Sequence, residues 1–340
     1  MPDLYIQKNS MEDFLKLPKV SFVVVTHNFT KFVWGCLESI KNQTYKNFEI
    51  IVVDDFSKDD TFQKITEFKK ANPQLDCTII RNENNKGQLA SFLEGLKQAT
   101  GQFVCAVDGD DILFPEYCAI HIETHMKTSV AMTTCRQAEI DENNMIHTLS
   151  SIDSPNKKTE NLKIANKSYD EFQNYRHAQG IDDEGTSVKV LDNDKYSFAT
   201  WHWGPTTSAM MRKSVCDMLL LLDNTRGLRI TADKFMFSFC HLIGSSAIIY
   251  KVLYAYRRHA NNYSLANPVM GNKKYLKERT QNNYFRNNKK IRIQMFKFIS
   301  KNKEYFKEKI NKTNLILLYK KIIFSFDTRF FKGLVKSLFI

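Results

Sequence analysis

Short apolar runs alternate with amphipathic segments through the first 130 residues of the chain. Each run is rich in β-branched or aromatic residues and stops at a polar residue, as expected of strands buried on both faces of a parallel sheet. The segments between the runs carry apolar residues at helical spacing. The pattern predicts strands at residues 20–26, 48–53, 77–80 and 103–107, and helices near residues 32–40, 62–68, 89–96 and after Pro115. Strands alternating with helices in this way indicate βαβ units and a mostly parallel sheet between helices.

Polar residues directly follow each predicted strand. They are His27 and Asn28, Asp54 and Asp55, Arg81, and the acidic group Asp108, Asp110 and Asp111. Because βαβ connections are right-handed, the carboxyl ends of these strands should gather on one edge of the sheet. Open α/β sheets bind their ligands at that edge. We therefore expect these side chains to form one site.

The acidic group lies in the stretch GQFVCAVDGDDILFP, residues 101–115. Three carboxylates this close repel one another unless a positive charge lies between them, and a hard divalent cation with a phosphate-bearing ligand would supply it. An acidic turn before the helix at Pro115 is the structural alternative, and we assign Asp111 to that capping role. A site with acids for a cation and polar side chains beside them suits a nucleotide diphosphate. The chain has neither G-x-x-x-x-G-K-[ST] nor G-x-G-x-x-G, so neither a P-loop nor a dinucleotide fingerprint is an alternative.

Four motifs in the first half carry a family resemblance. VSFVVVTHN, FEIIVVDDFSKDDT, NNKG and GQFVCAVDGDDILFP, in this order, resemble the nucleotide-binding half of the inverting glycosyltransferases of family 2, which have the GT-A fold. The resemblance implies that His27, Asp55 and Arg81 lie at the nucleotide base. It also implies that Asp108 contacts the ribose or the metal, and that Asp110 binds a Mg²⁺ or Mn²⁺ bridging the two phosphates of a sugar nucleotide.

The chain departs from the family pattern at three places. His27 stands where tyrosine is commoner, Phe56 replaces the usual glycine, and the A-R-N signature reads Ser91-Phe92-Leu93. These differences bear on the preferred base and sugar more than on the reaction.

The resemblance extends to three segments of the second half. In the family, a turn at the position of Trp201, His202, Trp203 and Gly204 borders the sugars, and Asp233 stands at the position of the catalytic base, at the start of a helix. The late segment that ends in Arg257, Arg258 and His259 implies contacts with the phosphates by the arginines and with the metal by His259. Each segment also has a structural reading: core aromatic rings, an acid favoured at a helix amino end, and a basic strand end facing solvent.

A histidine pair on the helix after the acidic loop resembles a zinc site. His121 and His125 are four residues apart, but neither a third ligand nor the order H-E-x-x-H accompanies them. We therefore expect no metal role for this pair.

The charge of the chain divides it into a body and a tail. The net charge is +12, yet residues 271–340 hold 19 Lys/Arg against 4 Asp/Glu, so the body is slightly acidic and the tail strongly basic. We divide the chain into an N-terminal extension (1–17), a GT-A catalytic domain (18–270) and a basic helical tail (271–340). The domain comprises a nucleotide-sugar-binding half (18–130) and an acceptor half (131–270), which contains a polar insertion at about 150–195 with one possible helix at 169–178.

The tail ends in an amphipathic segment, with apolar residues from Phe330 to Phe339 on one helical face and Arg329, Lys332 and Lys336 on the other. Such a segment is typical of helices that lie in a membrane interface, so we expect residues 305–340 to bind an anionic membrane. Nucleic acid is the less favoured partner. Seven scattered cysteines and the absence of a secretory leader pattern lead us to expect a cytoplasmic protein, peripheral on the inner face of the membrane.

These observations predict a metal-dependent inverting glycosyltransferase. The donor would be a sugar nucleotide, with uridine favoured, and the acceptor a hydroxyl of a surface glycan or a lipid-linked saccharide. A non-catalytic basic adaptor is the first alternative. A nucleotidyltransferase is the second, although a glycine-rich loop with arginine and lysine after the first strand is missing.

Overall fold

The computed structural model describes residues 17–149, 186–193, 202–228, 232–259 and 290–324. Its strands are β1 (Val20–Thr26), β2 (Phe48–Asp54), β3 (Cys77–Arg81), β4 (Phe103–Asp108), β5 (Ile112–Leu113), β6 (Met132–Ile140), β7 (Ile146–Leu149), β8 (Val188–Leu191), β9 (Ala209–Arg212) and β10 (Ser246–Arg257). Its labelled helices are α2 (Val33–Lys41), α3 (Thr61–Ala71), α4 (Gln88–Leu96), α5 (Tyr117–Lys127), α8 (Lys213–Cys216), α9 (Ala232–Gly244) and α11 (Lys303–Phe324), with the 3₁₀ turns η1 (Thr206–Ser208), η2 (Asp217–Leu221) and η3 (Arg226–Leu228). The four predicted strands and the helices that follow them are confirmed.

One mixed sheet runs through the described part of the molecule in the order β3-β2-β1-β4-β9-β6-β10-β5, with β7 beside β6 and β8 beside β10. β3, β2, β1 and β4 are parallel, whereas β9 runs antiparallel to both β4 and β6. The register aligns Thr26 with Asp54, and Asp54 with Arg81. The polar residues that follow these strands therefore lie along one edge, as the sequence predicted.

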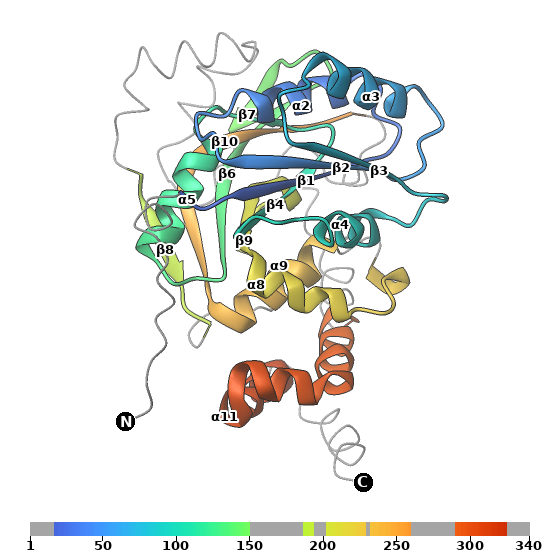
Figure 1. Ribbon diagram of the computed structural model, residues 1–340. Helices are drawn as coiled ribbons and strands as arrows, with labels where there is room; N and C mark the ends of the chain where they lie inside the picture. Colours follow the sequence, from blue (N-terminus) through green and yellow to red (C-terminus); the bar gives the residue numbers. More distant parts are fainter. Residues whose placement is uncertain (1–16, 150–185, 194–201, 229–231, 260–289, 325–340) are drawn as a thin grey trace, which may run out of the picture.

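Helices cover both faces of the sheet (Figure 1). Phe22 and Val24 of β1 point into a core that includes α2, α3 and α5, whereas Val23 points into a second core with α4, α8 and α9. Alternate residues of the neighbouring strands divide in the same way. Burial on both faces explains why these strands read as unbroken apolar runs.

The basic tail is not a separate unit where the structure describes it. Residues 290–301 are helical, and side chains such as Met295, Phe298 and Phe306 are buried in the same core as Phe235 and Phe239 of α9. The predicted division at residue 270 is therefore wrong for residues 290–324, whose apolar faces cover α9. None of the described helices is long and apolar enough to cross a membrane.

The predicted insertion and the predicted tail are each described only in part. The possible helix at 169–178 and the amphipathic segment 329–339 lie outside the described residues, as do residues 1–16. Within the predicted insertion, Val188–Leu191 form β8, an antiparallel strand beside the first half of β10. The insertion therefore contributes to the sheet at this point.

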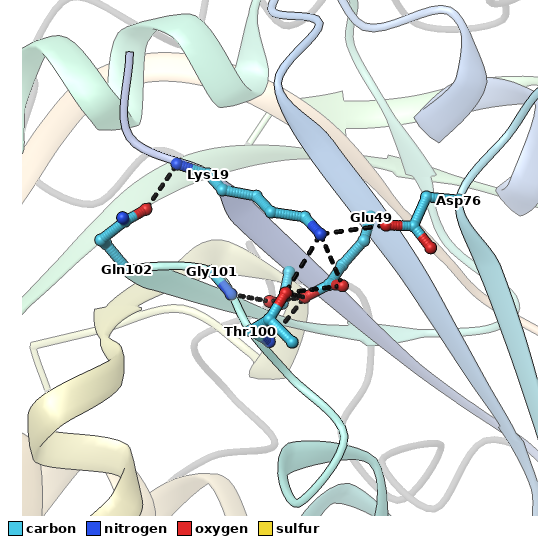
Figure 2. Close-up of polar contacts among 7 residues, drawn as sticks. Lys19, Glu49, Asp76, Thr100, Gly101 and Gln102 are labelled. Carbon is cyan, nitrogen blue, oxygen red and sulfur yellow. Dashed lines mark hydrogen bonds and ion pairs between the residues drawn. The ribbon is translucent and has the colours of Figure 1, made fainter. Parts of the chain in front are cut away.

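A polar cluster ties three strands together at the amino ends of β1, β2 and β4 (Figure 2). The acidic loop follows the opposite, carboxyl end of β4. The Glu49 carboxylate accepts hydrogen bonds from the Ser21 hydroxyl (2.6 Å), the Thr100 backbone N–H (2.7 Å) and the Lys19 ammonium (2.9 Å). Burial alone would raise the pKa of Glu49, but these hydrogen bonds outweigh it and hold the pKa below its usual value. Glu49 is therefore ionised at neutral pH, and its carboxylate accepts hydrogen bonds from the side chains and backbone named above.

Glu49→Gln should destabilise the fold by on the order of 2 kcal/mol at pH 7, since it weakens several charge-assisted hydrogen bonds at a buried site. Because the folded-state pKa is lowered, this contribution is present above the ordinary glutamate pKa of 4.5 and is lost as the pH falls below it. Urea unfolding at pH 7 and pH 4 should show the difference between wild type and variant shrinking. Glu38→Gln, at a half-exposed ion pair with Lys41, is the matched control and should change little. A deficit for Glu49→Gln that is the same at both pH values would contradict this account.

Candidate active site

The acidic loop follows β4 directly and is packed against the end of β1. The Gly109 N–H donates to the Val25 carbonyl (2.9 Å), and a Cβ at Gly109 would lie 2.8 Å from Cβ of Thr26. A side chain at position 109 would therefore push the loop away from β1. This close approach explains the glycine between Asp108 and Asp110.

Asp108 is held by side chains from both halves of the domain. Its Oδ1 accepts a hydrogen bond from Gln88 Nε2 (2.6 Å), and its backbone N–H donates to Thr207 Oγ1 (3.0 Å). Burial and the negative charge of Asp110 raise the pKa of Asp108 to about 7, and the charge of Asp233 adds to this effect. The carboxyl groups of the two halves thus lie close enough to influence each other.

Asp110 is paired with His259. The family resemblance implied that both side chains bind the metal. His259 Nε2 lies 2.8 Å from Asp110 Oδ2, and both side chains are buried. The imidazole packs against the rings of Phe29 and Phe32, with centroids 5.5 Å and 5.0 Å away. Two predicted metal ligands from distant parts of the sequence are therefore adjacent.

Asp111 does not cap the following helix, contrary to the sequence prediction. The helix begins at Tyr117, with Glu116 at its cap position, and Asp111 is completely buried. Its Oδ1 accepts the backbone N–H of Arg257 (2.9 Å), while Oδ2 is buried without a hydrogen-bond partner. Burial, followed by the charges of Asp110 and Asp108, raises its pKa well above the ordinary range. Asp111 therefore fastens the end of β10 beneath the acidic loop.

Arg257 supports the loop from inside rather than facing a ligand. Its guanidinium donates to the carbonyls of Asp110 (2.7 Å) and Asp141 (2.8 Å) and lies over the Phe32 ring, and the residue is only 3% exposed. This corrects the prediction that Arg257 meets donor phosphates, because its side chain is enclosed by protein. Arg258 forms an ion pair with the buried Glu139 at 2.8 Å.

The predicted base-binding residues lie together beside the acidic loop. Both carboxylate oxygens of Asp55 accept hydrogen bonds from the loop after β3, from the N–H groups of Lys86 and Gly87 (both 2.8 Å) and from the Asn82 amide (2.9 Å). Asp55 thus organises the N-N-K-G loop. Arg81 lies over the Phe62 ring, with its Nε 3.3 Å from Asp54 Oδ2.

His27 has one ring nitrogen that the protein leaves unsatisfied. The amide nitrogens of Asn28 and Asn85 both lie 3.1 Å from Nε2, so the hydrogen-bond pattern assigns the ring proton to Nδ1. Nδ1 is buried and has no partner. A buried donor without a partner is costly, and a ligand carbonyl would satisfy it.

Phe56 accounts for one departure from the family pattern. Its φ of 63° lies in the left-handed region, which glycine adopts freely and a bulky residue adopts only with strain. The backbone conformation is thus the one that the usual glycine favours. The Phe56 ring is covered by Lys58, whose Nζ lies 3.4 Å from the ring centroid.

Asp233 lies in the first turn of α9 and is half-buried. Burial raises its pKa above the ordinary aspartate value, although the backbone N–H of Lys234, 2.7 Å from Oδ1, and the Lys234 charge oppose this effect. A carboxylate whose pKa is raised accepts a proton more readily near neutral pH.

Of the predicted sugar-binding turn at residues 201–204, only part is accessible to a ligand. Trp203 is 1% exposed, packs against Phe237 and His241, and donates its indole N–H to Ser246 Oγ (2.9 Å). It is a core residue, so the prediction that it stacks on a sugar is wrong. His202 and Gly204 are half-buried, and Trp201 lies outside the described residues.

Three contacts at the acidic loop were not predicted from the sequence. Gln88, Thr206 and Thr207 all hydrogen-bond with Asp108 or with one another, but they belong to no motif with a chemical signature. Only the fold shows that α4 and η1 meet at this loop.

His121 and His125 are core residues. His121 Nδ1 lies 2.7 Å and His125 Nε2 lies 3.1 Å from the Thr133 hydroxyl. Burial lowers the pKa of His125 to about 3, so it is neutral at physiological pH.

The residues at the acidic loop fit a divalent cation in part. Among the described residues, no group of three or more His, Cys, Asp or Glu side chains forms a complete metal site. Mg²⁺, however, is usually held by one or two carboxylates together with substrate phosphates and water. The crowded carboxyl groups of Asp108 and Asp110, with the orphaned Asp111 oxygen below, suit a cation whose other ligands come from a diphosphate.

Comparison with known proteins places this arrangement in a family. The family model described as Glycosyl transferase family 2 matches residues 21–220. Bacillus subtilis EpsH is 33% identical over 110 residues, which are 32% of this chain and 31% of EpsH. The Escherichia coli protein WfgD, a UDP-Glc:alpha-D-GlcNAc-diphosphoundecaprenol beta-1,3-glucosyltransferase, is 29% identical over 40% of this chain and 51% of its own length. The first curated relatives are thus matched over about a third of their length.

Two solved structures share the fold. Staphylococcus aureus TarS in complex with UDP-GlcNAc aligns with a TM-score of 0.50 and 17% identity over 74% of this chain and 62% of that one. The mannosyltransferase PcManGT from Pyrobaculum calidifontis, in complex with GDP-Man and Mn²⁺, aligns with a TM-score of 0.51 and 16% identity over 73% of this chain and 59% of that one. The mixed sheet between helices is thus the GT-A fold.

Proposed function

Because the chain belongs to glycosyl transferase family 2, we propose that it transfers a sugar from a nucleotide diphosphate, with uridine as the base, to an acceptor hydroxyl with inversion at the anomeric carbon. The observation that carries the proposal is the meeting of Asp108, Asp110 and His259 at one edge of the sheet, with the charge of Asp233 acting on Asp108. WfgD, named for a UDP-Glc donor, and TarS, solved with UDP-GlcNAc, support a uridine nucleotide.

In the proposed reaction Asp233 is the general base. The acceptor oxygen attacks the anomeric carbon while Asp233 takes the hydroxyl proton, and the bond from that carbon to the diphosphate breaks. The raised pKa of Asp233 suits this role. Asp110, Asp108 and His259 would hold Mg²⁺ or Mn²⁺, which compensates the charge of the leaving diphosphate. The Mn²⁺ in the PcManGT complex supports a divalent ion.

A thermal-shift screen of sugar nucleotides with Mn²⁺ tests the proposal. A ligand that binds the folded state raises the melting temperature in proportion to its affinity and concentration. We expect a uridine diphosphate sugar to give the largest shift and to be consumed when an acceptor is added. Equal shifts for UDP, GDP and ADP sugars, or none, would contradict the uridine assignment.

For the acceptor and the location, we propose a lipid-linked saccharide at an anionic membrane. WfgD is named for a diphosphoundecaprenol acceptor. Residues 290–309 also expose six lysines, at positions 290, 297, 301, 303, 307 and 309, of which Lys301, Lys307 and Lys309 are paired with acidic side chains. Lysines near an anionic leaflet contribute about 1 kcal/mol each.

Deleting residues 325–340 tests the membrane part and removes none of the residues that the structure describes. A deletion from residue 305 would remove Phe306 and Leu318, which are buried. Loss of Arg329, Lys332 and Lys336 should weaken binding to phosphatidylglycerol vesicles by about 100-fold at low salt, at about 1 kcal/mol per charge. Sedimentation with phosphatidylcholine vesicles is the control. Unchanged binding by the deletion variant would exclude these residues as the membrane anchor.

A further inference from the structure

Gln88 occupies a junction that the proposed reaction does not use. It is the first residue of α4, and its side-chain amide lies 2.6 Å from Asp108 Oδ1 and 3.1 Å from Thr206 Oγ1. An amide nitrogen has two hydrogens, so it can donate to both oxygens at once. One side chain thus joins the acidic loop of the nucleotide half to the η1 turn of the acceptor half.

Both sides of this junction are fixed by other contacts. Asp55 holds the N–H groups of Lys86 and Gly87, and Gly87 has a φ of 88°, which sets the entry into α4. On the other side, the Tyr117 hydroxyl donates to the Thr207 carbonyl (2.9 Å) within the buried η1 turn. The backbone on both sides of the Gln88 hydrogen bonds is therefore held in place.

We propose that Gln88 is a positioning residue that orients the Asp108 carboxylate toward the donor diphosphate and its cation, with Thr206 as its support. The amide is uncharged, so it directs one carboxylate oxygen without cancelling the negative charge that a cation requires. A lysine at this position would instead form an ion pair with Asp108. The inference rests on the proposed function and deepens it, because it assigns the residue that keeps Asp108 in place for cation binding.

Binding of Mn²⁺ in the presence of UDP, followed by the electron paramagnetic resonance signal of free Mn²⁺, tests the proposal without turnover. Groups that orient metal ligands typically change metal affinity by 10–100-fold when they are removed. Gln88→Met keeps the length of the side chain and removes the donor, so it should weaken Mn²⁺ binding by at least about 10-fold. Thr206→Val should weaken it less, and Thr206→Ser should retain wild-type binding because the hydroxyl remains.

The double variant separates positioning from general destabilisation. If Thr206 acts through Gln88, adding Thr206→Val to Gln88→Met should cause no further loss. Gln98→Met, at an exposed glutamine just after the same helix, is the matched control and should bind Mn²⁺ as the wild type does. Wild-type affinity in Gln88→Met, or equal losses in Thr206→Ser and Thr206→Val, would overturn the inference alone. A wild-type protein that binds no Mn²⁺ with UDP would overturn the proposed metal site and this inference together.

Discussion

Asp233→Asn should retain donor binding and lose about 10²–10⁴-fold in the rate of transfer, the contribution typical of a general base. The substitution preserves the size of the side chain and its acceptor oxygen toward the Lys234 N–H, but removes the group that can take the proton. Because burial raises the pKa of Asp233, the wild-type rate should fall with decreasing pH at values above the ordinary aspartate range, as the base becomes protonated. Discontinuous assays of the transfer rate at several pH values, and titrations with UDP, measure catalysis and donor binding separately for both proteins.

Asp217→Asn provides the matched control for this prediction. Asp217 lies in η2, is partly exposed, and pairs with Lys213 (2.8 Å). Its replacement should leave both binding and transfer within about two-fold, since an exposed ion pair contributes little. A fully active Asp233→Asn variant would remove Asp233 as the base.

Asp110→Asn is expected to abolish cation-dependent donor binding and transfer. A neutral amide is a much poorer ligand for a hard cation than a carboxylate, and the pairing with His259 would also change. Because Asp110 is proposed as a direct ligand, the loss in affinity for Mn²⁺ with UDP should exceed the roughly 10–100-fold caused by removing a group that only orients a ligand. Calorimetric titration of UDP with and without Mn²⁺ gives the comparison.

Asp60→Asn tests whether the effect is specific to the loop. Asp60 is an exposed aspartate before α3, and its side chain makes no capping hydrogen bond. This variant should bind UDP and Mn²⁺ as the wild type does. Should Asp110→Asn match it, the metal role assigned to Asp110 would have to be abandoned.

The first half of the fold could be predicted because its signals are local. The apolar runs ending at Thr26, Asp54 and Asp108 are short and bounded by turn residues, and right-handed connections leave one arrangement for their carboxyl ends. The adjacency of Asp110 and His259 followed from the family resemblance rather than from any pattern in the residues.

The errors arose where the sequence does not reveal which way a side chain faces. Trp203 and Arg257 have residue types that suit sugar stacking and phosphate binding. Trp203, however, packs against α9, and Arg257 is enclosed by the acidic loop, Asp141 and the Phe32 ring. Lysines dominate the composition of the tail, so the sequence predicts a separate unit. Residues such as Met295 and Phe298 instead bury the apolar faces of its helices against α9.

Family membership also bears on the choice among the three functions that the sequence allowed. Membership of glycosyl transferase family 2 favours the proposed sugar transfer over a non-catalytic adaptor and over a nucleotidyltransferase. The described helices of the basic tail share a core with α9, so their contribution to stability must be measured separately from any contribution to membrane binding.

We propose above all that one edge of the sheet binds a uridine diphosphate through a cation held by the acidic loop. Calorimetric titration of UDP into the wild-type protein, first with Mn²⁺ and then with EDTA, tests it most directly. We expect saturable binding with Mn²⁺ that weakens at least about 10-fold with EDTA, because the diphosphate would then face the charges of Asp108 and Asp110 without a cation. Equal affinity under both conditions would contradict the account.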